Sequence, residues 1–177
     1  MAQNRTVTDI LQELKKDYKN VLLRAVEQAT NTACEDVYKF SMSVLDRYYE
    51  NYMPSRYERT DSLHKATVPI AEVKDHGDVV SATFGVKYDS EILEAFAAQS
   101  YFEASSKYGK VDGDWVIMNY LMGIHPATNG SSDPNTVVYT PWQDGRSPDE
   151  YLKRYLQIRK VKLVDDVNDI LIKYIAK

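Results

Sequence analysis

The first 53 residues contain neither glycine nor proline, and this constrains the fold more than any other feature of the chain. Apolar residues recur there in steps of three or four, the spacing of one helical face: Ile10, Leu14, Tyr18, Leu22, Ala25, Ala29, Ala33, Val37, Phe40, Val44, Tyr48 and Tyr52. Pro54 disfavours helical backbone at the residue before it. We therefore predict one helix over 7–52, and leave open a break near Asn20. Unbroken, it would be roughly 65–70 Å long, so part of it should project or pack on a neighbour.

A β-hairpin is predicted over 66–88. Its first strand, Thr67–Lys74, contains Pro69, which suits an edge strand or a strand start. The turn is Asp75-His76-Gly77-Asp78, and the second strand is Val79–Tyr88. In that second strand alternate residues are apolar, which predicts one face turned toward a core.

The C-terminal helix is predicted over 148–175. Ser147, Pro148 and Glu150 form a strong helix start, with a capping serine, a proline in the first turn and a glutamate at the third position. Its apolar face has eight members: Leu152, Tyr155, Leu156, Leu163, Val167, Ile170, Leu171 and Tyr174.

The segment 89–146 reads as an insertion of helices and loops. Asp89 or Ser90 can cap a helix through 91–108. Residues 115–122 form a short apolar segment that stops before Gly123, a residue typical of helix C-termini. We predict a long loop over 123–135 and a short strand over 136–140. The whole chain of 177 residues is expected to be a single α+β domain, with the two long helices packed on a small, mainly antiparallel sheet.

Composition narrows the function classes. The net charge of −4 argues against a general nucleic-acid binder, and no apolar run is long enough to span a membrane. The N-terminus lacks an apolar signal-peptide core, so we expect the chain to stay in the cytoplasm where it is made. Cys34 is the one cysteine, which excludes an internal disulfide and favours a buried structural thiol over a nucleophile.

The residues that usually carry chemistry do not form a known motif. The three histidines, His64, His76 and His125, have no second histidine or cysteine at ligand spacing. No nucleophile elbow or phosphate-binding glycine loop is present. The carboxylates Asp165, Asp166 and Asp169 are interpreted as a solvated helix face rather than a metal site. We therefore predict no catalytic residue, no metal and no cofactor.

Residues 48–60 instead hold four tyrosines and two arginines, the residue types that fill protein interfaces. Tyr48 and Tyr52 can equally continue the core stripe of the helix, and stacking of bases on the tyrosines is a third interpretation. Trp142, beside Pro141, is either a plug over the core or an interface anchor. The candidate interface residues are Tyr49, Tyr52, Arg56, Tyr57, Arg59, His125 and Trp142.

The order of elements, together with Tyr52-x-Pro54-x-x-Tyr57-x-Arg59-Thr60-x-x-Leu63 and Gly123-Ile124-His125-Pro126, resembles the tail-completion or neck proteins of tailed bacteriophages. The resemblance covers most of the chain by order of elements and is specific over 48–66. It departs from the family at Asp61, where glycine is frequent, and in the large segment 89–146.

The resemblance implies a non-enzymatic virion protein, assembled in the host cytoplasm, that forms a homo-oligomeric ring at the head–tail junction. Portal or adaptor and tail-tube proteins would be its partners. DNA would only pass through the ring, and no membrane is involved. Two alternatives stay open: an aromatic-rich regulatory binding module, or a small hydrolase-like or nucleotide-processing enzyme. The enzyme would have a pocket in 101–146, built from His125, Asp114, Tyr120 and Trp142.

Overall fold

The computed structural model describes residues 7–50, 62–93, 113–122, 124–126, 137–139 and 146–176. Two long helices, α1 (Val7–Glu50) and α5 (Pro148–Ile175), frame the molecule. Between them in the chain come the short helix α2 (Ser62–Ala66), the strands β1 (Thr67–Asp75) and β2 (Val80–Tyr88), the helix α4 (Gly113–Met122), and the strands β3 (Ile124–Pro126) and β4 (Val137–Tyr139). Long helices packed on a small antiparallel sheet confirm the predicted α+β class.

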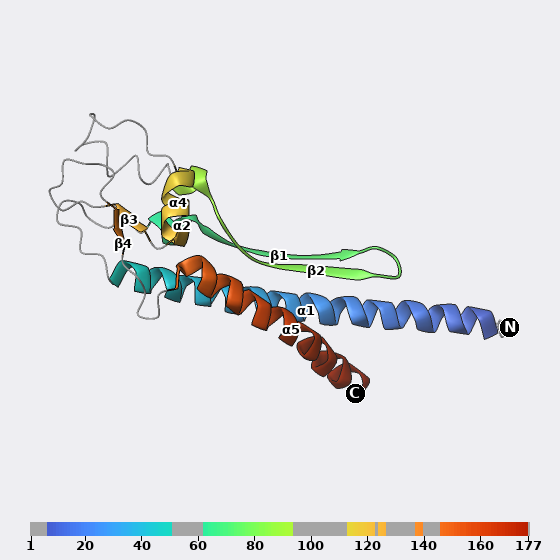
Figure 1. Cartoon of the computed structure of the whole chain (residues 1–177). Coiled ribbons are helices and arrows are strands. Elements are labelled where there is room, and N and C mark those ends of the chain that lie inside the picture. The colour runs from blue at the N-terminus through green and yellow to red at the C-terminus, as the bar shows by residue number, and fades with distance from the viewer. Residues whose placement is uncertain are drawn as a thin grey trace.

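Helix α1 is continuous over 44 residues and passes through Asn20 without a break. The absence of glycine and proline explains this, because no residue in the stretch favours a kink. Residues 51 and 52 of the predicted helix lie outside the described residues. Figure 1 shows α1 as the longest element, with α5 on one side of it and the β1–β2 hairpin on another.

The hairpin pairs Thr67 with Tyr88 at one end and Asp75 with Val80 at the other. Its turn depends on Gly77, whose φ of +85° is costly for a side chain with a Cβ. The Gly77 N–H donates to Asp75 Oδ1 at 2.9 Å, and the His76 N–H donates to the Val79 carbonyl at 2.8 Å. The predicted hairpin is confirmed, although Ala66 belongs to α2 rather than to a strand.

The hairpin lies along one side of α1, where Thr30 and Cys34 are buried. The Cys34 Sγ donates to the Ile70 carbonyl of β1 at 3.1 Å. A buried thiol bonded to backbone agrees with the structural interpretation of this cysteine.

The main hydrophobic core forms around the C-terminal half of α1, where α2, α4 and the start of α5 converge. Tyr120 of α4 is fully buried, with its ring edge-on to Tyr48 at 5.1 Å and to Tyr88 at 5.5 Å. The core residues are Val44, Leu45, Tyr48, Leu63, Ala66, Leu93, Tyr120 and Leu152.

The helix starts predicted from local sequence are present. The Asp89 carboxylate accepts the N–H groups of Glu91 and Ile92, and helical backbone begins at Ser90; the predicted helix beyond 93 lies outside the described residues. At α5 the Ser147 hydroxyl accepts the Glu150 N–H while the Glu150 carboxylate accepts the Ser147 N–H, which is a complete capping box.

Two predictions were wrong. The loop over 123–135 contains a strand, because Ile124–Pro126 pairs with Val137–Tyr139 in an antiparallel ladder. The connector predicted over 54–65 ends earlier than expected, because Ser62 already begins α2. Here Thr67 Oγ1 donates to the Leu63 carbonyl at 2.7 Å, which ties the end of α2 to the first residue of β1.

Candidate interaction surface

Most of the predicted interface residues lie in segments that the structure does not describe. Tyr52, Arg56, Tyr57, Arg59 and Trp142 lie outside the described residues. The backbone of Tyr49 is in the last turn of α1, and that of His125 is in β3, opposite Val138; the side chains of both are outside the description. The surface proposed from these residues therefore stays a prediction.

The residues considered for an enzyme pocket are also only partly described. Tyr120 is fully buried in the core, where its ring packs against Tyr48 and Tyr88, whereas Asp114 is exposed in the first turn of α4. Tyr120 is therefore a core residue, as its contacts with the other tyrosines show. Within the described segments no group of three or more histidine, cysteine, aspartate or glutamate side chains is placed to hold a metal ion.

A small opening lies between α1 and β1. Its volume is about 170 Å³, which is below the range usual for organic ligands. Six residues line it: Glu27, Thr30, Asn31, Ala71, Glu72 and Val73.

The most unusual surface is on the N-terminal part of α1. Val7, Leu11, Leu14 and Tyr18 are 74, 60, 59 and 59% exposed, and we call these four residues the tip face. Their spacing of four, three and four residues places them on one side of the helix, as in a coiled-coil seam. Leu14 and Tyr18 belong to the apolar stripe predicted from sequence, but no described residue covers them.

The tip face is beyond the reach of α5. Phe40 of α1 stacks on Tyr155 of α5 with ring centroids 4.1 Å apart. Four residues away on each helix, Asp36 pairs with Arg159, so the residue number falls on α1 as it rises on α5. When this residue-by-residue pairing of the two helices is extended, Ile175, the last residue of α5, lies level with Asn20 of α1. Figure 1 shows in addition that α5 diverges from α1 toward its C-terminus.

A second uncovered apolar surface lies on α5. Successive residues of a helix are rotated by about 100°, which places the exposed apolar residues of α5 on the side opposite Leu152 and Arg159. Those two residues are buried and face α1. The apolar residues on the opposite side are between 55 and 75% exposed, and we call them the outer face: Ile158, Val161, Val164, Ile172 and Ile175. This stripe was missed in the sequence, because α5 was assigned one apolar face and carries two.

Arg159 fixes α5 on α1. Its side chain is only 4% exposed, and Nη2 lies 3.3 Å from Asp36 Oδ2 and 3.1 Å from Asp166 Oδ2. Burying a guanidinium is tolerated here because two carboxylates compensate the charge. The sequence held a signal for this residue, since Arg159 occupies the helical position between Leu156 and Leu163 where the apolar face would otherwise continue.

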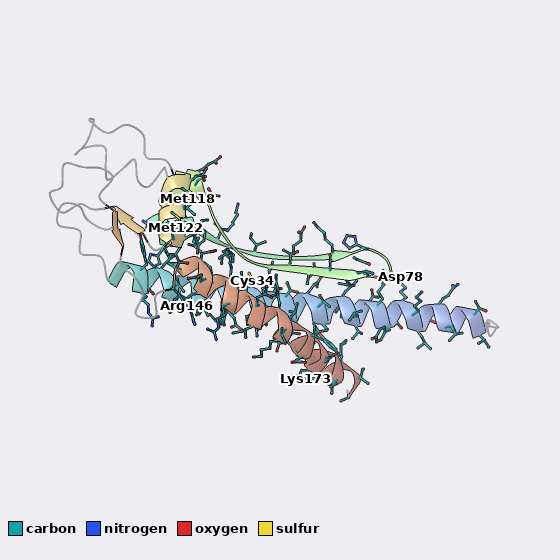
Figure 2. All side chains as sticks on the ribbon, in the orientation of Figure 1. Cys34, Asp78, Met118, Met122, Arg146 and Lys173 are labelled. Atoms are coloured by element: carbon teal, nitrogen blue, oxygen red, sulfur yellow. The ribbon has the colours of Figure 1, made fainter. Side chains whose placement is uncertain are left out.

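Ion pairs hold the hairpin turn beside the tip face. Lys19 Nζ lies 2.8 Å from Asp75 Oδ2, and Lys15 Nζ lies 3.9 Å from Asp78 Oδ1. The lysine and the Gly77 N–H lower the pKa of the Asp75 carboxyl below its ordinary value, the lysine being the larger cause. Figure 2 places Asp78 at the hairpin turn above α1, and Lys173 near the diverging end of α5.

None of the described helices is both long and apolar enough to span a membrane. No known protein family, curated protein or solved structure matches this chain.

Proposed function

We propose that this chain is a non-enzymatic assembly protein that forms a homo-oligomer through its long helices. The observation that carries the proposal is the pair of uncovered apolar surfaces, the tip face on α1 and the outer face on α5. Exposed apolar patches of this kind mark sites of protein–protein contact. Amphipathic helices commonly bury such stripes against another helix.

The site of assembly we propose is the head–tail junction of a tailed bacteriophage, as a ring between portal or adaptor proteins and the tail tube. The support is the resemblance to neck and tail-completion proteins over 48–66. A ring needs one face of a subunit to meet a different face of the next. Two distinct apolar faces on one chain satisfy that requirement. DNA would pass through the ring without specific contacts, in keeping with the net charge of −4.

Two measurements test the proposal, one for self-assembly and one for the role in the phage particle. Sedimentation velocity and native mass spectrometry of the purified chain at micromolar concentration should give a closed oligomer, visible as rings by negative-stain microscopy. A monomer over the whole concentration range would overturn self-assembly.

The phage role is tested separately by quantitative mass spectrometry of purified virus particles from the source culture. Peptides of this chain at a low, ring-like copy number relative to the major capsid protein are the expected result. An oligomer in solution without these peptides in particles would leave an assembly protein and remove the proposed location.

A further inference from the structure

We infer that neighbouring copies are joined by the tip face of one copy packing antiparallel on the outer face of the next. The inference rests on the proposed self-assembly and specifies its contact. In this arrangement each of the two faces is covered by another copy of this chain.

The first argument is continuity with the contact between α1 and α5. At about 100° per residue, Val7, Leu11, Leu14 and Tyr18 point within about 40° of the direction of Asp36, which binds α5. The tip face therefore extends the side of α1 on which a helix already packs. Because the α5 of the same chain reaches only to the level of Asn20, the next helix on this side has to come from elsewhere.

The second argument is that the two faces cannot cover each other within one chain. The outer face points away from the α1 on which α5 is packed, and the tip face lies beyond the end of α5. Two different faces that pair between copies make a heterologous contact, which propagates from copy to copy and closes into a ring when the rotation allows. A tip-to-tip or outer-to-outer pair would leave the other face uncovered, and a two-fold dimer would need both tip-to-outer contacts to form between the same two copies.

The third argument is register and charge. Aligned antiparallel, Val7, Leu11 and Tyr18 come level with Ile175, Ile172 and Val164 of the next copy. The part of that α5 before Val164 has to turn away from α1, because the α5 of the same chain already covers this side of α1 from the level of Asn20 onward. Lys15 and Lys19 follow one edge of the tip face, and Asp165 and Asp169 follow one edge of the outer face. When two right-handed helices pack face to face in antiparallel orientation, the lysine edge of one lies beside the aspartate edge of the other. In parallel orientation the two edges lie on opposite sides of the contact. The lysines already bind Asp75 and Asp78, so the new carboxylates would extend an existing network.

The contact is small, and repetition around a ring compensates for this. The seven side chains that this register brings together, four of the tip face and three of the outer face, carry on the order of 100 Å² each, or on the order of 700 Å² of apolar surface. Flanking polar residues add to this area, and standard specific interfaces begin at about 1,200 Å² in total. In a closed ring every copy makes the contact twice, which adds to the stability of the assembly.

Complementation between two defective variants tests the heterologous contact. Leu11→Lys with Leu14→Lys disables the tip face, and Val164→Lys with Ile172→Lys disables the outer face; all four positions are exposed, so the fold should be retained. Each variant alone should be monomeric in sedimentation velocity, whereas an equimolar mixture should give a dimer and stop there.

The matched control is Gln12→Lys with Asn20→Lys, which adds the same charge to exposed positions on the opposite side of α1 and should assemble like the wild type. Assembly of either defective variant alone overturns the inference. So does a mixture that stays monomeric while circular dichroism shows both variants folded.

Cross-linking tests the register. Leu11→Cys in one chain and Ile172→Cys in another should form a disulfide on mild oxidation, while Leu11→Cys with Val161→Cys, the parallel arrangement, should not. A single chain carrying both Leu11→Cys and Ile172→Cys should give a ladder of covalent multimers.

A disulfide within one chain, or a Leu11→Cys homodimer, would overturn the inference by showing that the chain itself or a second tip face covers this surface. If the wild type forms an oligomer but these cross-links fail, the inferred contact is wrong and self-assembly stands. If the wild type is a monomer throughout, both fail.

Discussion

The guanidinium of Arg159 on α5 lies 3.3 Å from the carboxylate of Asp36 on α1, at a point where the arginine is almost completely buried. Asp166, seven residues further along α5, lies 3.1 Å from the same nitrogen. One cation thus joins two carboxylates, and it sets how far α5 extends along α1. The position of the uncovered tip face follows from this register.

Replacing Arg159 by alanine should lower the free energy of unfolding by about 2–3 kcal/mol. Removing one partner of a fully buried pair costs about 3–5 kcal/mol, and the cost is smaller here because Asp36 is 39% exposed and can be rehydrated. Urea denaturation followed by circular dichroism measures it. Lys153→Ala, which breaks an exposed pair with Asp149, is the control and should cost less than about 1 kcal/mol. Equal effects of the two variants would refute the structural role of Arg159.

Replacing Tyr120 by alanine should cost about 3–5 kcal/mol, because it removes a fully buried ring and leaves a cavity between Tyr48 and Tyr88. Met118→Ala, two residues away on the exposed side of α4, should change stability by less than about 0.5 kcal/mol. Thermal unfolding of both variants gives the comparison. A stable Tyr120→Ala protein would show that α4 does not pack as described.

Replacing Ser147 by alanine should destabilise the start of α5 by about 1 kcal/mol, since Glu150 loses the hydroxyl that accepts its N–H at 3.3 Å. Ser43→Ala removes an exposed serine inside α1 and should be neutral or slightly stabilising, because alanine is the better helix former. Hydrogen exchange of the first turn of α5 offers a local readout. Protection there should fall in the Ser147 variant alone.

The ionisation of Asp89 makes the free energy of unfolding depend on pH in the acid range. The Ile92 N–H is the largest cause that lowers the pKa of the Asp89 carboxyl below the ordinary 3.8; burial opposes it, and Lys87 and the Glu91 N–H lower the pKa further. The folded state therefore binds this proton less readily than the unfolded chain, so the ionised form stabilises the fold above about pH 3.8, and the stabilisation is lost as the pH falls through the lowered pKa. Asp89→Asn keeps an N-cap but removes the charge.

The wild type should therefore be more stable than Asp89→Asn at neutral pH, and the two should converge below pH 3.8. Denaturation curves measured at a series of pH values between 2 and 7 test this. A constant difference across the series would contradict the assignment of the lowered pKa to Asp89.

The aromatic connector yields a prediction of its own. Tyr57→Ala combined with Arg59→Ala should leave the isolated fold intact and weaken assembly, if these residues face outward as their composition indicates. Circular dichroism and sedimentation of the double variant distinguish the cases. Loss of the fold would assign both residues to the core or to the helix end.

The parts of the fold that the sequence predicted are those set by local chemistry. The long helix follows from an uninterrupted apolar period, the hairpin turn from Gly77, and the start of α5 from the capping box. Each signal lies within a few residues of the structure it specifies. The Asp89 cap was found for the same reason.

The features that escaped prediction depend on residues distant in sequence. Ile124–Pro126 is a strand only because Val137–Tyr139 pairs with it, and three residues are too few to show a period. Arg159 interrupts an apolar face, and its partner Asp36 lies on another helix. The length of α1 predicted that part of it would project or pack on a neighbour, but not which residues would be exposed there, because periodicity shows that residues share a side of a helix and not whether a neighbour covers it.

Helix α1 packs on α5 and the hairpin as far as Lys19 and continues without interruption to Val7. From Lys19 to Val7 the helix rises about 18 Å, so a tilt of about 10° at Lys19 displaces the far end by about 3 Å. The helix is thus a lever arm, and small rotations at the end of the hairpin become larger displacements where copies are proposed to meet. Strain imposed on one end of such an assembly would be transmitted mechanically from each subunit to the next.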